Sequence, residues 1–238
     1  MLPLAMAFPR AVFAGEGAGG AYNPAFVTFN GSTWFNRASQ GAMADSAGGT
    51  FSITIDTDKA DGSAFYLLYL GSQVQVWRTS ANKFSILLYS TTGALICNAT
   101  VTTPYLAATG QVTLTVAWDM SVPALQVYVN GVAAAFTTTT FAVGVVDYTI
   151  GTGLIWIAAK AATNGLPYSG TMTDLYFKAG FTDLSVPANL AKFYTGGAPA
   201  KPTDYADIFF GDGQTAAQWN AGQGRGSVSL WTTTGGVS

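Results

Sequence analysis

Histidine is absent from this 238-residue chain, which removes the commonest general base and metal ligand of proteins. Nucleophilic sites that pair serine or cysteine with histidine are therefore excluded. Glutamate occurs once, as Glu16, so a glycosidase would have to build its carboxylate pair from aspartates. Asp119, Asp147 and Asp174 each stand alone, with no second carboxylate two or four positions away. We therefore predict that the protein is not an enzyme.

Charge is also scarce. Charged residues make up 9% of the chain, the net charge is −2 and the mean hydropathy is +0.30, whereas about a quarter of an ordinary soluble domain is charged. A stable extracellular β-protein would be one explanation, and a subunit covered by its neighbours would be another. Because a surface with little charge is easily desolvated, we favour the second. The expected partners are copies of the same chain or other subunits of an assembly.

Further classes of partner are excluded by what the sequence lacks. The ten Lys and Arg residues are scattered singly between Arg10 and Arg225, so no basic stripe is present to bind nucleic acid. The apolar run at residues 1–8 is far short of the ~20 residues that span a bilayer. No basic segment precedes that run, so we expect neither a membrane partner nor a cleaved signal peptide. Cys97 is the one cysteine, and we expect it to be a buried free thiol.

The clearest pattern in the chain is the alternation of apolar and polar residues between Gln111 and Phe136. Apolar side chains take every second position from Val112 to Trp118, and again from Leu125 to Val129, which is the period of a strand with one buried face. Asn130-Gly131 follows, and both residues tolerate the positive φ of a type I′ hairpin turn. The pattern predicts three consecutive antiparallel strands, with Trp118 in the core.

Elsewhere, short apolar segments separated by turn residues predict an all-β sandwich or barrel. Residues 1–24 are rich in Gly, Ala and Pro, follow neither period and are interpreted as an N-terminal arm. Residues 25–238 are expected to form a single sandwich, completed by a last hairpin at about residues 205–238. One short helix is predicted from Pro187 to Tyr194, with Ser185 as its cap.

One loop carries enough carboxylates to raise the question of calcium. Asp56, Asp58 and Asp61 fall within seven residues of each other, and Lys59 lies between them. The spacing does not match an EF-hand, and no glutamate is present to serve as a bidentate ligand. Asp and Gly are also the residues that a hairpin turn favours. We therefore predict a turn, with no metal and no cofactor.

Several motifs, taken in order, resemble the concanavalin A-like (LamG-like) jelly-roll family. They are Phe29–Phe35, Gly49–Ile55, Trp118-Asp119, Leu125–Val132, Tyr168–Phe177, Leu184-Ser185 and Phe193–Gly197. The resemblance covers about residues 26–197 and implies a sandwich of two antiparallel sheets, with one short helix in the C-terminal third. The segment Ile208–Thr232 also looks like the tail of LamG-like proteins found in tailed-bacteriophage virions.

The resemblance and the scarcity of charge together lead us to expect a structural protein of a phage virion, in a capsid decoration, head fibre or tail. Its partners would be other virion proteins, with residues 1–24 as the anchoring arm. The alternative is a carbohydrate-binding module or host-surface adhesin, because Trp77 is out of phase with Val74 and Val76 and should point outward. Sugars stack on exposed aromatic rings, although Trp77 would serve equally well as an interface anchor. We predict no catalytic, cofactor-binding or metal-binding residues.

Overall fold

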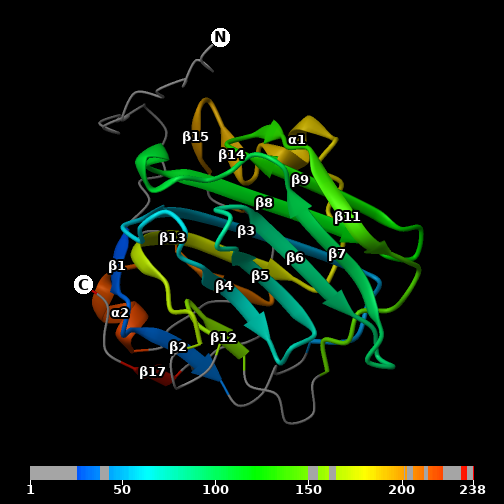
Figure 1. Cartoon of the computed structure of the whole chain (residues 1–238), viewed down its shortest axis with the longest axis horizontal. Helices are drawn as coiled ribbons and strands as arrows, with labels where there is room; N and C mark the ends of the chain where they lie inside the picture. Colours follow the sequence, from blue (N-terminus) through cyan, green and yellow to red (C-terminus); the bar gives the residue numbers. More distant parts are fainter. Residues whose placement is uncertain are drawn as a thin grey trace.

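In the computed structural model, the protein consists mainly of two antiparallel sheets packed face to face (Figure 1). The structure describes residues 26–37, 43–149, 155–160, 165–200, 202, 206–211, 214–221, 232–234 and 238. The predicted arm at residues 1–24 and much of the predicted last hairpin lie outside these residues. Within the described part of the chain, the predicted all-β sandwich of two antiparallel sheets is confirmed.

The first sheet has seven strands, with a long strand at its centre. In spatial order they are β1 (Val27–Asn30), β13 (Ser169–Lys178), β3 (Gly48–Thr57), β8 (Val112–Asp119), β9 (Ala124–Val129) and β10 (Val132–Ala133), and β16 (Ile208–Phe210) also pairs with β13. Every pairing in this sheet is antiparallel. The order brings β1 from the start of the described chain beside β13, so the sandwich is closed by contacts between distant parts of the sequence.

The second sheet has eight strands. In spatial order they are β11 (Phe136–Phe141), β7 (Leu95–Val101), β6 (Phe84–Tyr89), β5 (Val74–Arg78), β4 (Phe65–Leu70), β12 (Ile155–Ile157), β2 (Trp34–Arg37) and β17 (Thr232–Thr234). A separate small hairpin is formed by β14 (Tyr194–Thr195) and β15 (Ala198–Pro199). The remaining elements are the short helices α1 (Pro187–Leu190) and α2 (Ala216–Asn220) and the 3-10 turn η1 (Ala107–Thr109).

The predicted meander is confirmed for its first two strands. β8 and β9 pair antiparallel, and the turn after them has φ values of 50° at Asn130 and 72° at Gly131, as a type I′ turn requires. The third strand differs from the prediction, because it pairs with β9 for only two residues as β10. The chain then crosses to the other sheet and continues as β11.

The core lies between the two sheets and consists mainly of apolar side chains. Trp118 is buried, as predicted, and its Nε1 donates a hydrogen bond of 2.9 Å to the hydroxyl of Tyr148. That hydroxyl donates in turn to the carbonyl of Gly48 at 2.9 Å. Cys97 is a buried free thiol, as predicted, and its burial raises the pKa of the thiol to about 12.

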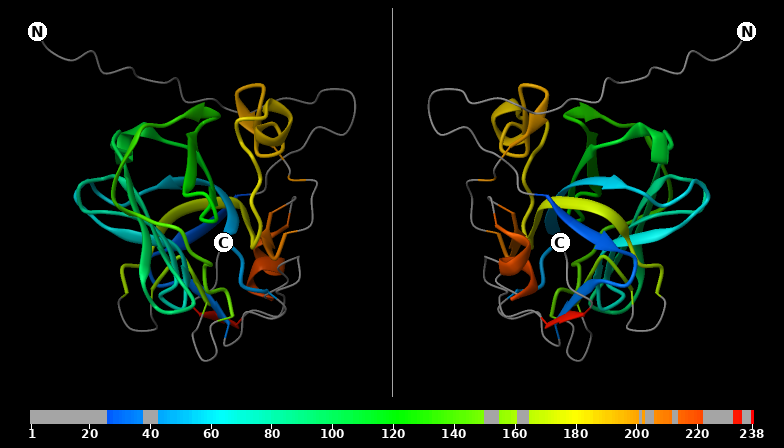
Figure 2. Two further views of the ribbon diagram at one scale, coloured as in Figure 1. Left: turned by 90° about the vertical axis from the view of Figure 1, so that its right-hand side faces the viewer. Right: turned by 90° about the vertical axis from the view of Figure 1, so that its left-hand side faces the viewer.

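The outer face of the seven-stranded sheet is covered by the C-terminal third of the chain. Tyr176 and Ala117 of this face pack with Leu184, Phe193 and Phe209 in a second buried cluster. Figure 2 shows the covering segment, with α1, β14 and β15, on the side of this sheet that faces away from β4–β7. The other outer face of the sandwich belongs to the eight-stranded sheet, where Trp34, Tyr69 and Trp77 are half-buried and Tyr66 and Trp156 are buried.

The prediction of a single helix is wrong in extent and in number. α1 begins at Pro187 as predicted but ends at Leu190, and its N-cap is Val186. Ser185 does not act as the cap because its hydroxyl donates to the carboxylate of Asp183 at 2.6 Å. None of the helices in the described part of the chain has the length and apolar character needed to cross a bilayer.

The second helix, α2, lies inside the segment for which we predicted a hairpin. Thr215 caps it by accepting a hydrogen bond from the backbone N–H of Gln218, whose side chain reaches back to the N–H of Thr215 at 2.8 Å. This reciprocal pair is a capping box. The helix buries Trp219 completely in the core. The sequence did not predict this helix, because a single turn is too short to show a helical period and the surrounding segment is rich in glycine.

Candidate functional site

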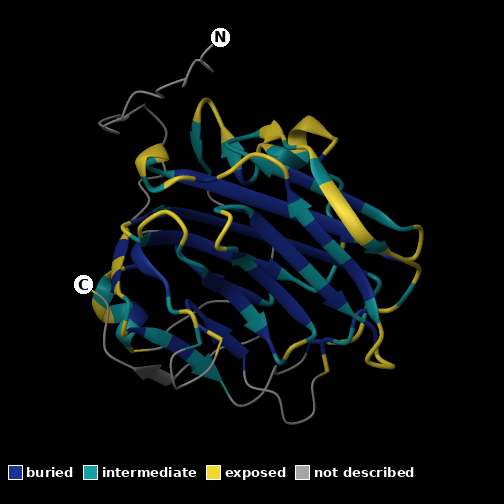
Figure 3. Cartoon of the chain, in the orientation of Figure 1, coloured by how far each residue is buried: buried dark blue, intermediate teal, exposed yellow. Residues whose placement is uncertain are grey.

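Five aromatic side chains lie on the outer face of the eight-stranded sheet, and we call them the aromatic row. They are Trp34 of β2, Trp156 of β12, Tyr69 and Tyr66 of β4, and Trp77 of β5. Each one alternates along its strand with an apolar residue of the core cluster, so the period of the strands turns the row away from the core. Figure 3 shows this face of the sheet turned toward the viewer.

The rings of the row pack on one another. Tyr66 and Trp77 are cross-strand partners, and their rings stack with centroids 5.3 Å apart at an interplanar angle of 18°. Tyr69 meets Tyr66 edge to face at 5.7 Å, and Trp34 and Trp156 lie 6.4 Å apart. Such contacts hold each ring in one orientation. Trp77 is half-buried rather than fully covered, so part of its indole remains available to a ligand.

Polar groups lie directly beside these rings. The hydroxyl of Tyr66 donates to Oε1 of Gln75 at 3.1 Å, and Nε2 of Gln75 donates to the carbonyl of Ser72 at 3.0 Å. Desolvation, together with the neighbouring Tyr69, raises the pKa of Tyr66 to about 12. The hydroxyl of Tyr66 thus donates to Gln75 and keeps its side chain in place.

A lysine completes the row. The ammonium group of Lys160, which is exposed, lies 5.6 Å from the ring centroid of Tyr66 and 5.7 Å from that of Tyr69. These distances are within the range of cation–π interactions. On the other side of Trp77, its cross-strand partner is Ser85. The face therefore combines flat apolar rings with hydroxyl, amide and ammonium groups, which can bind a ligand.

The sequence predicted only part of this arrangement. Trp77 was expected to point outward, and its half-buried position on the outer face confirms this. The other four members of the row were missed. The alternation of the strands could have indicated them; Tyr69, for example, lies between Leu68 and Leu70 and therefore points to the opposite face. What the sequence could not show is that β4, β5, β12 and β2 are neighbours.

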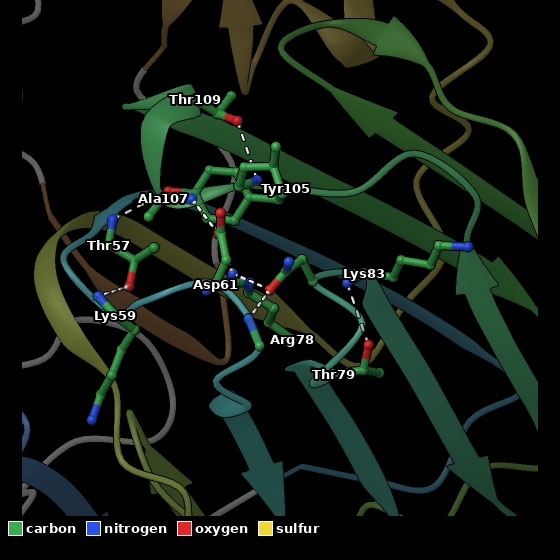
Figure 4. A network of polar contacts seen from close by, with 12 residues as sticks. Thr57, Lys59, Asp61, Arg78, Thr79, Lys83, Tyr105, Ala107 and Thr109 are labelled. Atoms are coloured by element: carbon green, nitrogen blue, oxygen red, sulfur yellow. Dashed lines mark hydrogen bonds and ion pairs between the residues drawn. The ribbon is translucent and has the colours of Figure 1, made fainter.

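A second polar cluster lies at one end of the sandwich (Figure 4). The guanidinium of Arg78 is fully buried there and forms an ion pair of 3.0 Å with Asp61. It also donates to Asn82 and lies over the rings of Phe65, at 5.4 Å, and Tyr105, at 5.8 Å. Desolvation lowers the pKa of Arg78, and the nearby Asp61 opposes that shift. The cluster ties together the loops that precede β4 and follow β5.

The ion pair bears on the loop that we considered for calcium. The Oδ1 atom of Asp61 pairs with Arg78 and also accepts a hydrogen bond from the N–H of Ala107 at 2.9 Å. Asp56 is half-buried and Asp58 is exposed. In the part of the chain that the structure describes, no three acidic, histidine or cysteine side chains form a group that could hold a metal ion. The absence of a metal remains a prediction.

Replacing Asp61 by alanine is expected to lower the free energy of unfolding by about 2 kcal/mol, because the buried Arg78 loses its charged hydrogen-bond partner. Chemical denaturation measures this loss, and the exposed Asp58→Ala is the matched control. Since we assign the loop a structural role, the melting temperatures of the native chain in chelator and in calcium should agree. A rise of several degrees with calcium that Asp58→Ala removes would show that the loop binds the ion.

The fold does not bring together the three aspartates that stand alone in the sequence, although Asp45 and Asp147 both accept hydrogen bonds from Thr149. Asp119 accepts hydrogen bonds from the N–H and hydroxyl of Ser121 in a turn. Asp147 accepts from Gln73 at 3.0 Å and from the N–H of Thr149 at 3.1 Å. Asp174 is buried within β13. They lie in three separate parts of the fold.

No family model matches the sequence, and no curated protein sequence matches it significantly. Solved structures with a similar fold include a Bacteroides ovatus protein to which carbohydrate binding is provisionally assigned, with a TM-score of 0.64 and 14% identity over 90% of this chain. The heptameric SAP-like pentraxin of Limulus polyphemus has a TM-score of 0.52 and 9% identity, over 90% of this chain and 93% of its own. The extracellular region of zebrafish Gpr126/Adgrg6 has a TM-score of 0.52 and 12% identity, over 90% of this chain and 26% of its own.

At these identities the similarity establishes the fold and nothing finer. The chain spans 58% of the length of the Bacteroides ovatus protein. None of the three proteins is described as a virion component, so the predicted virion role gains no support from them. The chain has the concanavalin A-like jelly-roll fold, as the resemblance of its motifs predicted.

Proposed function

We propose that the protein is a non-catalytic carbohydrate-binding module whose ligand lies on the outer face of the eight-stranded sheet. The observation that carries the proposal is the stack of Trp77 on Tyr66, at 5.3 Å and 18°, with Gln75 held beside it by the hydroxyl of Tyr66. A pyranose ring has an apolar face and a rim of hydroxyl groups. A half-buried indole binds the apolar face, and amide and hydroxyl groups at its edge bind the rim.

Two further observations support this proposal over the virion role. The outer face of the other sheet is covered by the C-terminal segment, whereas Trp34, Tyr69 and Trp77 of the aromatic row keep part of their surface exposed beside the buried Tyr66 and Trp156. Carbohydrate binding is also the function provisionally assigned to the Bacteroides ovatus protein of the same fold. The virion location and the virion partners stay predictions. The anchoring role of residues 1–24 also stays a prediction, because these residues lie outside the part of the chain that the structure describes.

Replacement of Trp77 by alanine is expected to weaken glycan binding by about 1–3 kcal/mol, by analogy with the stacking of aromatic side chains on nucleic-acid bases. A glycan array on the isolated native chain would select the ligand, and calorimetry would then measure its Kd for both proteins. Tyr66→Phe keeps the ring but removes the hydroxyl that holds Gln75, so it should have a smaller effect.

The matched control is Leu106→Ala, which shortens a side chain that is exposed and lies outside the aromatic row. It should bind with the affinity of the native chain. Absence of saturable binding to any glycan on the array would contradict the proposed function. Binding that Trp77→Ala leaves unchanged would instead move the site to another surface.

A further inference from the structure

β11 forms one edge of the eight-stranded sheet. Within the described residues it pairs with β7 on one side only. Thr137, Thr138 and Thr139 are all exposed. An edge strand presents a row of backbone N–H and C=O groups that can pair with another strand. The exposed side of β11 is therefore a surface that offers main-chain hydrogen bonds.

Two of the usual devices that protect an edge, charged residues and proline, are missing from this one. No charged residue occurs anywhere between Asp119 and Asp147, and no proline follows Pro123 until Pro167. Natural edge strands are commonly blocked by lysine, by proline or by bulges. The one irregularity here is a shift of register between Thr138 and Thr140. Threonine and phenylalanine, which make up the whole strand, favour the extended conformation.

Exposed apolar side chains continue from this edge. Val143 is 67% exposed and Val145 is 45% exposed, in the segment that directly follows β11. Backbone hydrogen bonds from Ala142 to Ile96, at 2.8 Å, and from Gly144 to Met120, at 2.9 Å, hold this segment against the body of the protein. A strand edge and an apolar flank are thus presented together in a fixed arrangement, which is typical of an interface.

We propose that β11 pairs antiparallel with β11 of a second copy of the chain. An antiparallel pair of identical strands is related by a two-fold axis, so the N–H and C=O groups that β11 turns away from β7 meet the same groups of the other copy in complementary pairs. Two copies bring no charge to the contact, because residues 120–146 carry none. The apolar flank beside the strand adds area that becomes buried in the same contact.

This pairing would join the two eight-stranded sheets into one continuous sheet. The two-fold axis would then run perpendicular to the sheet, which places both aromatic rows on the same side of the dimer. Two sites on one side can bind one multivalent glycan surface with higher avidity than either alone. This consequence rests on the proposed function, whereas the pairing of β11 does not.

Analytical ultracentrifugation of the native chain without glycan, across a series of concentrations, is the test. We expect a dimer for the native chain and a monomer, with half the mass, for Thr138→Lys. Thr138 is exposed on β11, so the lysine would place a charge on the edge, which opposes pairing. The expected weakening is at least tenfold in the dimer Kd, which corresponds to about 1.4 kcal/mol.

Ala217→Lys is the control, because it adds the same charge at an exposed position of α2, which Figure 1 places on the opposite side of the molecule from β11. It should remain a dimer. Val143→Lys provides a second disrupting variant outside the strand, in case Thr138→Lys does not fold. A native chain that is monomeric at every concentration would overturn the proposal. A dimer that persists in the folded disrupting variants would overturn it as well.

Discussion

Replacing Trp219 by alanine is expected to destabilise the protein by about 3–5 kcal/mol, the usual cost of truncating a large buried aromatic side chain. The indole is completely buried. Its ring centroid lies 4.8 Å from that of Phe210, 5.7 Å from that of Phe35 and 6.1 Å from that of Phe29. Truncation would therefore leave a cavity among three aromatic rings from both sheets.

Denaturant unfolding followed by far-UV circular dichroism measures this loss, since this signal does not depend on the fluorescence of the removed indole. Ala217→Ser changes an exposed residue of the same helix and should alter the stability by less than about 0.5 kcal/mol. The comparison also bears on the prediction that residues 25–238 form one sandwich. If Trp219→Ala unfolds at the same denaturant concentration as the native chain, the C-terminal helix does not contribute to the core.

A methyl group at Gly49 is expected to destabilise the fold by about 3 kcal/mol, through overpacking. A Cβ atom at Gly49 would overlap the six-membered ring of Trp118 and the hydroxyl of Tyr148. Neither side chain has room to retreat, because both are fully buried and are hydrogen-bonded to each other at 2.9 Å. The chain approaches the indole so closely at this point that glycine alone fits there.

The midpoint of thermal or urea unfolding reports this effect. Gly180→Ala is the control, since a Cβ there would make only an ordinary contact with Lys178 at 3.5 Å. Combining Gly49→Ala with Trp118→Phe should recover part of the loss, because the smaller ring vacates space and the two sites are coupled. A stable Gly49→Ala variant would show that the backbone of β3 does not approach Trp118 as closely as described.

The sequence by itself determined the type and pairing of the best-patterned elements. The strands β8 and β9 and the turn at Asn130-Gly131 follow from residues close together in the chain, because a period of two and a positive φ are local properties. The same local logic placed Trp118 in the core and Trp77 on the opposite face of its strand. It failed for α2, a single turn that buries Trp219 in the core.

Only the tertiary structure decided which outer sheet face the C-terminal segment covers. Both sheets alternate in the same way, and Thr113 and Thr115 of β8 looked like residues of a solvated face although both are buried. The C-terminal segment packs on the outer face of the seven-stranded sheet and buries it. This packing depends on contacts between residues far apart in the chain. The aromatic row has the same origin, since Trp77 and Trp156 come from distant segments that share a face through the order of the strands. Strand order depends on long-range packing, which no local pattern encodes.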